Sequence, residues 1–451
     1  MAKQGVSKDM TDGSLMKHVI GFTFPLLFGY IFQNVYSVVD TVIVGRYLGV
    51  DALAAVGATG SVNFLIVGFC LGLCSGFAIP VAQMFGAKDP KALKKYAGNA
   101  ITLAAVFALI ITVITSVFCM NILTLMKTPD NIIQMSYNYI FVIFLGIPTI
   151  VMYNLLSGFL RSLGDSKNPL YFLIVSSFLN IGLDLIFIIF LNMGILGASL
   201  ATVISQTVSG ILCIILIVRK VDLLHIGRGD LVLQKKYVYN LLRMGFPMGF
   251  QYSITAIGSV ILQTAVNTLG SVYIAATTAA NKLGLFLACP YDALGSTMAT
   301  YSGQNVGAGK TERLWPGLRA AIITGAVYSA LALLIVFVGG KYLLLLFVSA
   351  EETEVINNAY LYMFITAAFY LLLLLVNSVR FSIQGMGFSG LAVFAGLAEM
   401  VARTLVGIFL VPAFGYIAAC FASPVAWVFA DAFLIPAYIK CVKKLSRARS
   451  L

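Results

Sequence analysis

The sequence predicts an all-α, polytopic membrane protein, and three observations support this fold class. The 451 residues are 60% hydrophobic and only 10% charged, whereas a soluble chain has about 25% charged residues. Apolar stretches of roughly 20 residues recur along the whole chain, each long enough for a helix to cross about 30 Å of hydrocarbon. None of these stretches has the short alternating pattern of a membrane β-barrel.

The apolar stretches predict twelve transmembrane helices joined by short loops. The expected spans are 17–45, 53–81, 97–120, 137–160, 169–191, 195–218, 244–268, 274–300, 317–339, 358–382, 390–411 and 416–439. The longest polar connection lies between the sixth and seventh spans. We therefore expect an N-terminal lobe over residues 1–218, a cytoplasmic linker over 219–243 and a C-terminal lobe over 244–451.

The positive charges indicate the orientation in the membrane. Of the 29 Lys and Arg residues, only Arg46, Lys127 and Lys341 fall in the odd-numbered loops. The positive-inside rule then predicts a multi-pass protein of the inner (plasma) membrane with both termini in the cytoplasm. The same rule accounts for the net charge of +12, so we expect no nucleic-acid partner, since no basic residues cluster on a soluble fold.

Short motifs recur at a spacing of about 221 residues and indicate an internal duplication. Gln83 to Ala87 is matched by Gln304 to Ala308, and Phe24-Pro25 by Phe246-Pro247. Each half has six spans, so both halves enter the membrane from the same side. This predicts two six-helix lobes related by a pseudo-two-fold axis along the membrane normal, the arrangement of transporters that work by alternating access. Pro25 removes a backbone hydrogen bond and is predicted to act as a hinge.

Three helices of the first half carry polar residues four apart, which places each pair on one helix face. Counting 1.5 Å per residue puts one member of each pair roughly 9–12 Å below the outer face. The pairs could therefore line one pocket with carboxylate, amide, hydroxyl and phenol oxygens. They are Tyr36 with Asp40, Asn180 with Asp184, and Thr202 with Gln206.

The two aspartates indicate an ion path. A carboxylate at mid-membrane depth costs roughly 2.5–3.5 kcal/mol, so such residues usually have a function. Two neighbouring carboxylates can hold a proton, and hard oxygen ligands can instead coordinate sodium. The residues do not decide between these two cations. The alternative is that these polar groups only bond the helices together.

The second half carries Glu399 and Arg403 four apart in span 11. This pair is open to two interpretations, a structural ion pair or a contribution to substrate binding. Gln251 and Lys282 are further candidates for lining a pocket, and Asp292 and Asp431 are other acidic residues inside spans. We expect most of these groups to be paired within the protein.

The sequence does not favour an enzyme. The only histidines, His18 and His225, lie at a span edge and in the linker, so the serine of Gly387-Phe388-Ser389-Gly390 lacks an evident base. Neither a Walker A loop nor an HExxH motif occurs. The seven cysteines show no metal-type pairing. We expect no cofactor and no obligatory protein partner, and small-molecule substrates and the lipid bilayer as partners.

The chain resembles the MATE (multidrug and toxic compound extrusion) family, and the prokaryotic DinF-like or MepA-like branch looks closest. The resemblance covers about residues 14 to 440. Its motifs are Asp40-Thr41 with Gly45, the Gln83…Gly86-Ala87 loop, Leu160 to Asp165, Asn180…Asp184 and Gly194…Thr202.

The resemblance implies a secondary antiporter that exports amphipathic, often cationic compounds in exchange for protons or sodium. It assigns the cation site to Asp40, Asn180, Asp184 and Thr202, with Tyr36, Tyr139, Asn154 and Gln206 nearby. Some branches have an acid in span 7 where this chain has Gln251, which argues against a second cation site of that type. The alternatives are a flippase for a lipid-linked substrate, whose cleft should be rich in basic residues, and a non-transporting scaffold.

Overall fold

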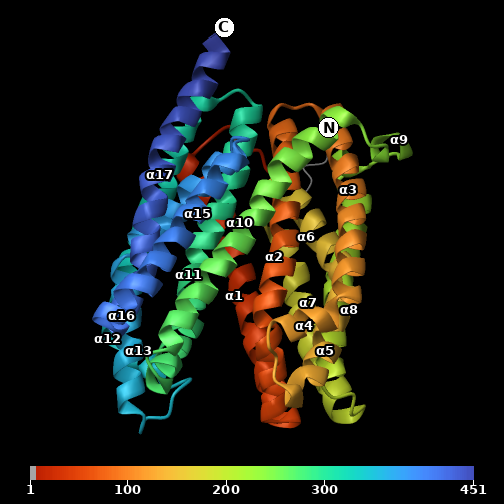
Figure 1. Ribbon diagram of the computed structural model, residues 1–451. Helices are drawn as coiled ribbons and strands as arrows, with labels where there is room; N and C mark the ends of the chain where they lie inside the picture. Colours follow the sequence, from red (N-terminus) through yellow and green to blue (C-terminus); the bar gives the residue numbers. More distant parts are fainter. Residues whose placement is uncertain (1–6, 451) are drawn as a thin grey trace. The chain divides into compact units, whose positions relative to one another are not determined.

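The computed structural model describes residues 7–450, and this part of the chain is helical throughout, with no strand (Figure 1). The first half contains α1 (Leu15–Leu48), α2 (Val50–Gly86), α3 (Pro90–Val117), α4 (Cys119–Leu125), α5 (Asp130–Leu145), α6 (Ile147–Ser162), α7 (Lys167–Leu185) with the π-helical turn η1 (Ile186–Phe190), and α8 (Ile195–Lys220). The 3₁₀ turn η2 (Asp222–Leu224) and α9 (Arg228–Leu231) follow.

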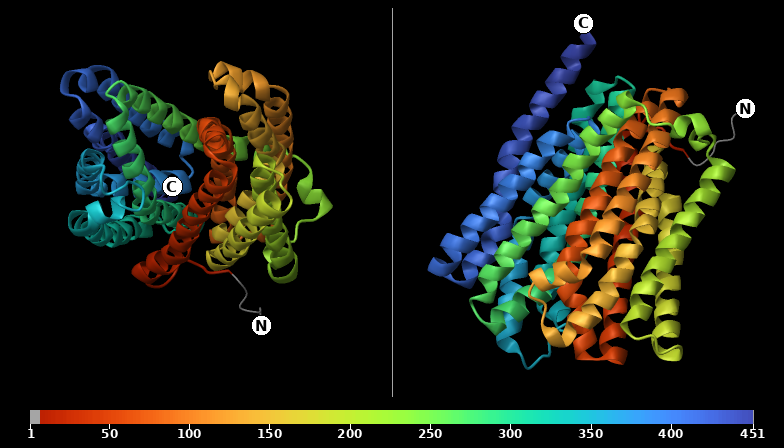
Figure 2. Two further views of the ribbon diagram at one scale, coloured as in Figure 1. Left: turned by 90° about the horizontal axis from the view of Figure 1, so that it is seen from below. Right: turned by 45° about the vertical axis from the view of Figure 1, so that its right-hand side comes forward.

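The second half begins with α10 (Lys235–Asn267) and α11 (Ser271–Gly307). It continues with η3 (Thr311–Arg313), α12 (Leu314–Leu344), α13 (Thr353–Ala368), α14 (Tyr370–Gly385), α15 (Ser389–Leu405), the π-helical turn η4 (Val406–Leu410), α16 (Val411–Phe414) and α17 (Tyr416–Ser450). Within each half the long helices pack side by side, for example α2 on α6 and α11 on α14 (Figure 2).

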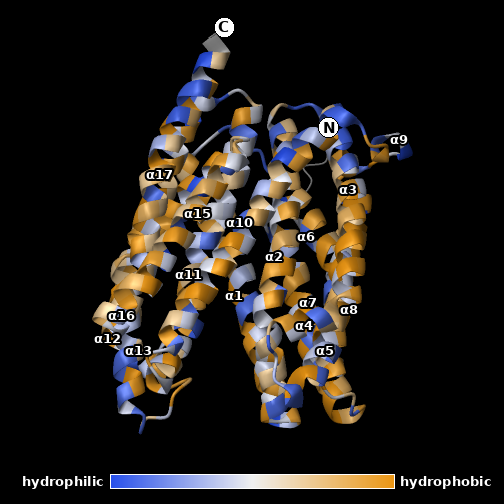
Figure 3. Cartoon of the chain, viewed as in Figure 1, coloured by the Kyte–Doolittle hydropathy of each residue, from blue (hydrophilic) through white to orange (hydrophobic). Residues whose placement is uncertain are grey.

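These helices coincide with the twelve expected spans. In the described part of the chain, nine helices are individually long and apolar enough to cross a bilayer. Two bent pairs, α5 with α6 and α13 with α14, bring the number to eleven. The twelfth expected span is α10, which is long enough to cross, but Gln251 and its polar neighbours dilute its apolar middle. Figure 3 shows hydrophobic residues along the helices and hydrophilic ones gathered at their ends.

The contacts divide the chain into two compact units, and the division passes through two helices. Unit 1 comprises Met1–Asp9 and Phe28–Gly249, and unit 2 comprises Met10–Leu27 and Phe250–Leu451. The chain therefore passes from one unit to the other inside α1 and again inside α10. The boundary between the lobes that the sequence predicts lies instead in the linker, residues 219–243. Pro25 and Pro247 each lie shortly before a point of crossing.

The backbone repeats its irregular features in the two halves, as the duplicated motifs predict. The α5–α6 bend is 46° and the α13–α14 bend is 51°. The π-helical turns η1 and η4 interrupt the fifth and eleventh spans at matching positions. Gly49 and Gly270 join matching helix pairs with φ of 87° and 111°, a conformation that favours glycine.

Glycines let α2 and the first half of α10 approach closely within unit 1. Gly72 faces the backbone of Met248 and Gly249, and a Cβ added at Gly76 would lie 2.5 Å from the Cα of Gly245. The sequence Gly68, Gly72, Gly76 is thus a small-residue packing stripe. Small residues serve this purpose in membranes, where helix association depends on van der Waals packing.

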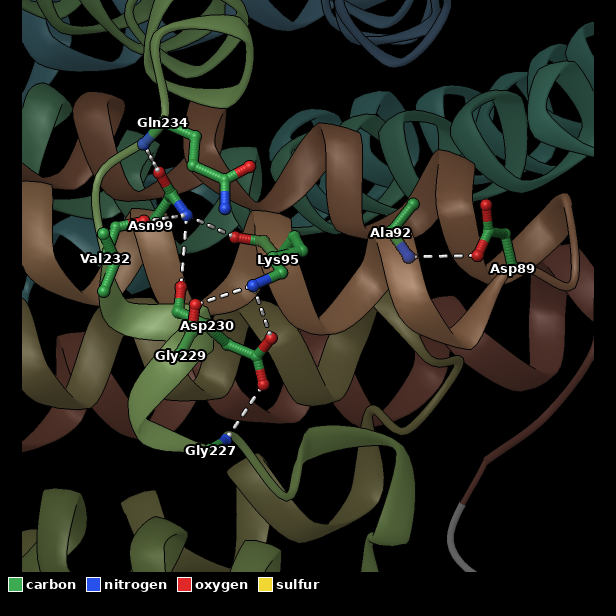
Figure 4. A network of polar contacts seen from close by, with 9 residues as sticks. All are labelled: Asp89, Ala92, Lys95, Asn99, Gly227, Gly229, Asp230, Val232 and Gln234. Carbon is green, nitrogen blue, oxygen red and sulfur yellow. Dashed lines mark hydrogen bonds and ion pairs between the residues drawn. The ribbon is translucent and has the colours of Figure 1, made fainter.

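The linker between the halves is docked on α3 (Figure 4). Asn99, which is fully buried, donates to the carbonyls of Asp230 and Val232 at 3.1 and 3.2 Å and accepts from the Gln234 N–H at 2.8 Å. Lys95 donates to the Gly229 carbonyl at 2.6 Å and pairs with Asp230 at 3.2 Å. The expected linker is therefore held on α3 through α9 and through the residues that follow it.

The ionised form of Asp230 is stabilised by groups of the linker and of α3. The Gly227 N–H donates to its carboxylate at 3.0 Å. That hydrogen bond, with the Lys95 ammonium, holds the pKa of Asp230 below its ordinary value. Because a lowered pKa stabilises the fold above the ordinary value and the gain is lost as pH falls through the lowered one, the dock stays charged at neutral pH.

Gly76→Ala is expected to destabilise the protein, because the new Cβ would overlap the backbone of α10. Overpacking of this kind typically costs about 1–3 kcal/mol. The measurement is the thermal unfolding midpoint in detergent. Gly60→Ala on the same helix is the control, since nothing lies within 4 Å of its added Cβ. Equal midpoints for the two variants would contradict close packing at Gly76.

Asn99→Ala is expected to release the linker while leaving the helices folded. Three hydrogen bonds at about 1 kcal/mol each would make local opening about a hundredfold more frequent. Limited trypsin digestion after the exposed Arg228 measures this opening. Asn138→Ala, which removes a half-buried amide elsewhere in unit 1 that bonds only to Gln134, should cleave like the wild type. An unchanged rate in Asn99→Ala would show that the linker is held by other contacts.

Candidate functional site

The structure brings the two aspartates of the first half together inside unit 1. Asp40 lies on α1 and is 9% exposed; Asp184 lies on α7 and is fully buried. Their carboxyl groups face each other at hydrogen-bonding range. Asp184 lies two residues before the start of η1, and π-helical turns of this kind are frequent at functional sites.

Neither Asp40 nor Asp184 takes part in any of the ion pairs found among the described residues, so no basic group neutralises them. Neither oxygen of Asp184 accepts a hydrogen bond from the protein, and Oδ1 of Asp40 is also without a donor. Two ionised carboxylates 4 Å apart would repel by about 4 kcal/mol at an effective dielectric constant of 20. A cation between the two groups, of which a proton is the smallest, would remove this repulsion.

Asn180 adds a neutral polar group one helical turn before Asp184. It is 1% exposed, and neither its Oδ1 nor its Nδ2 has a protein partner. A buried amide without a partner costs about 1–3 kcal/mol in proteins. Asp40, Asn180 and Asp184 thus leave four buried oxygens available to a hard cation.

Tyrosines surround the acidic pair. The Tyr36 hydroxyl lies at hydrogen-bonding range of Gln206 and Gln33, with Asp40 nearby. Tyr139, on α5, is buried close to Asp40, Asp184 and Tyr36. The structure thus gathers Tyr36, Tyr139 and Gln206 around the two aspartates, as the matched stripes and the resemblance predict.

Thr202 and Asn154 differ from Tyr36, Tyr139 and Gln206, because their side chains bond to the backbone of their own helices. Thr202 donates its hydroxyl to the Ala198 carbonyl at 3.2 Å, and Asn154 donates to the Ile150 carbonyl at 2.8 Å. Both side chains therefore bond to their own helices, α8 and α6. Their oxygens keep acceptor lone pairs, since each bond uses only the donor side.

In unit 2 one buried acid is paired with two buried arginines. Glu399 forms an ion pair with Arg380 on α14 through one oxygen and with Arg403 at 3.3 Å through the other. All three residues are at most 8% exposed. The i, i+4 pair expected on span 11 is present, and Arg380 is a partner that the sequence analysis missed. Helical spacing reveals partners on one helix and gives no signal for a partner on another.

The other two candidates of the second half, Gln251 and Lys282, have different partners. Gln251, at 6% exposure, accepts a hydrogen bond of 2.6 Å from Gln384. Lys282 is exposed and stands 5.9 Å from the ring centroid of Phe347. It lines an open pocket of about 560 Å³ with Glu352.

Comparison with known proteins supplies a family for this architecture. The MatE family model matches residues 25–186 and again 247–410, one copy in each half. The probable multidrug resistance protein YoeA of Bacillus subtilis is 32% identical over 356 residues, which cover 77% of each chain. The multidrug export protein MepA of Staphylococcus haemolyticus is 23% identical over 83% of this chain and 81% of its own.

A solved structure shows the same fold. The outward-facing conformation of a multidrug resistance MATE family transporter of the MOP superfamily matches with a TM-score of 0.92. The match covers 99% of both chains at 20% identity. This similarity confirms the expected fold class of twelve helices in two lobes.

Glu399→Gln is expected to lower the stability of unit 2, because Arg380 and Arg403 would lose their shared counter-ion inside the membrane. Removing one partner of a buried ion pair costs about 3–5 kcal/mol. The thermal unfolding midpoint in detergent measures the effect. Glu354→Gln at the exposed start of α13 is the control. A midpoint equal to that of the control would show that the bridge is dispensable.

Proposed function

The chain belongs to the MatE family, and we propose that it is a secondary antiporter of the plasma membrane that exports amphipathic, often cationic drugs or toxic compounds in exchange for protons or sodium ions. The multidrug resistance and multidrug export proteins among its relatives support this substrate class. The single observation that carries the coupling is the buried, unneutralised pair Asp40–Asp184.

In this proposal Asp40, Asn180, Asp184 and Thr202 bind the coupling cation, and Tyr36, Tyr139, Asn154 and Gln206 line the site. A cation would end the repulsion between Asp40 and Asp184, and its release restores that repulsion. The conformations with and without the cation then differ in free energy at this position. A ligand shifts a conformational equilibrium only through such a difference in affinity.

The membrane potential alone does not supply enough energy for the cycle. One charge crossing 100 mV contributes about 2.3 kcal/mol, whereas moving a two-state equilibrium from 1:99 to 99:1 needs about 5.5 kcal/mol. Substrate and cation must therefore bias the two states together. Pro25 is the proposed hinge in α1, and Pro247 is its duplicate in α10. Each proline removes one helical hydrogen bond close to where the chain changes units.

The proposed orientation places both termini in the cytoplasm. Within unit 1, the basic stretch after α2 and the docked linker contact each other through Lys95 and Asp230, so these two connections lie at the same end of the unit. Both are rich in Lys and Arg, and the positive-inside rule assigns that end to the cytoplasm.

The lipid-linked flippase is less well supported. A pyrophosphate group would need unpaired basic residues, and the sequence offers Lys282, Arg380 and Arg403 inside spans. Arg380 and Arg403 are both engaged by Glu399. The acidic pair of unit 1 would repel an anionic headgroup, which favours a cationic substrate.

Asp40→Asn is expected to abolish coupled efflux while leaving the protein folded, because an amide cannot take up a proton or provide a charge for sodium. Efflux of a fluorescent cation from proteoliposomes, driven by an imposed pH gradient or an imposed sodium gradient, measures this. Asp51→Asn, at the exposed start of α2, is the matched control. Wild-type efflux by Asp40→Asn would sink the assignment, and wild-type inactivity under both gradients would sink the antiport.

A further inference from the structure

A second cluster of buried charge lies in unit 2, whereas the cation site proposed above belongs to unit 1. It consists of Arg380 on α14, Glu399 and Arg403 on α15, and Asp431 on α17, which are 6%, 3%, 8% and 5% exposed. Charged residues this deep in a span are costly and usually functional. The first three are accounted for by the bridge through Glu399; Asp431 is not.

Asp431 is a buried carboxyl group without a hydrogen-bond donor. Neither of its oxygens has a protein partner. It lies within electrostatic range of Arg380 and Glu399 but pairs with neither arginine at 4 Å or less. The titratable and charged groups on the elements packed against α17 include Glu354, Tyr360 and Tyr362 on α13, Tyr370 and Arg380 on α14, Glu399 and Arg403 on α15, and Glu312 and Arg313 in η3.

The charges of the cluster favour neither the ionised nor the protonated form of Asp431 decisively. The bridge Arg380–Glu399–Arg403 has a net charge of +1, which attracts an ionised carboxylate. The same bridge commits one hydrogen-bonding edge of each arginine to Glu399, so an ionised Asp431 would be a buried charge without a direct hydrogen bond. A proton on Asp431 removes that penalty, because a neutral carboxyl group is far less costly to bury than an ionised one.

Several other buried polar atoms of unit 2 also lack a protein partner. Nε of Arg380, Nη1 of Arg403 and Oε1 of Gln384 are buried without a protein partner. The same holds for the hydroxyl of Tyr438, two helical turns beyond Asp431 on α17, and for Oδ1 of Asn305 near the end of α11. Sites of this kind are suited to bridging waters, which need two to four polar partners.

We propose that Asp431 is a second proton-binding site, in which the carboxyl group takes up and releases one proton beside the Arg380–Glu399–Arg403 bridge. When Asp431 is protonated, Glu399 holds both arginines, as in this structure. When it is ionised, it competes with Glu399 for Arg380. The site is independent of the Asp40–Asp184 pair and stands whether or not that pair couples transport.

The test is infrared difference spectroscopy of the purified full-length protein between mildly acidic and alkaline buffer. The background is the double variant Asp40→Asn, Asp184→Asn, which removes the acidic pair of unit 1. Aspartate carboxyls are labelled with carbon-13, so that aspartate bands shift and glutamate bands do not. We expect one labelled carboxylic-acid carbonyl band to disappear at alkaline pH, and Asp431→Asn to remove that band altogether.

Two further variants control the assignment. Asp292→Asn, which removes an exposed acid of α11 bonded to Asn377, should keep the band. Asp431→Glu retains an acid at the site, and should move the band from the labelled to the unlabelled set even if Asp431→Asn folds poorly. An identical carboxylic-acid spectrum with Asp, Asn or Glu at position 431 would falsify the proposal, since Asp431 would then be ionised throughout.

Discussion

The absence of water from the bilayer core is the constraint on which the rest of this structure depends. Every backbone polar group in a span must be satisfied within the protein, which makes the described chain helical. The same constraint makes buried charges conspicuous. In unit 2 Glu399 satisfies two arginines at once, whereas in unit 1 Asp40 and Asp184 face each other without a counter-ion. The duplication thus preserved the backbone, including both π-helical turns, while the electrostatics of the two halves diverged.

The sequence was sufficient to predict the helices and the helix faces that carry several of the candidate site residues. Apolar runs of about 20 residues have few alternatives to a membrane span, so the twelve predicted spans coincide with the observed helices. The i, i+4 rule identified the faces that carry Asp40, Asp184 and Gln206, because helical spacing is a local property. That Tyr36 lies beside Gln206 depends on how α1 and α8 are placed, and only the depth count pointed to it.

Contacts between different helices could not be predicted from the sequence. Arg380 joins Glu399 from another helix, and no spacing along one helix reveals such a partner. The linker looked like a plain polar connection in the sequence. In the structure the side-chain amide of Asn99 binds it through hydrogen bonds to three backbone groups. The contact division inside α1 and α10 was equally hidden, because hydropathy reports where a helix crosses the membrane and carries no information on which neighbours each part of it contacts.

The crossing of α1 and α10 between units has a consequence for the origin of the chain. Each compact unit includes half of a helix encoded in the other half of the gene: residues 10–27 belong with the second unit, and the start of α10 up to Gly249 with the first. A half-length ancestor folding alone would have left the glycine face of α2 uncovered. Two such chains would have to exchange helix segments to build this arrangement, whereas in the duplicated chain the exchange takes place within one polypeptide.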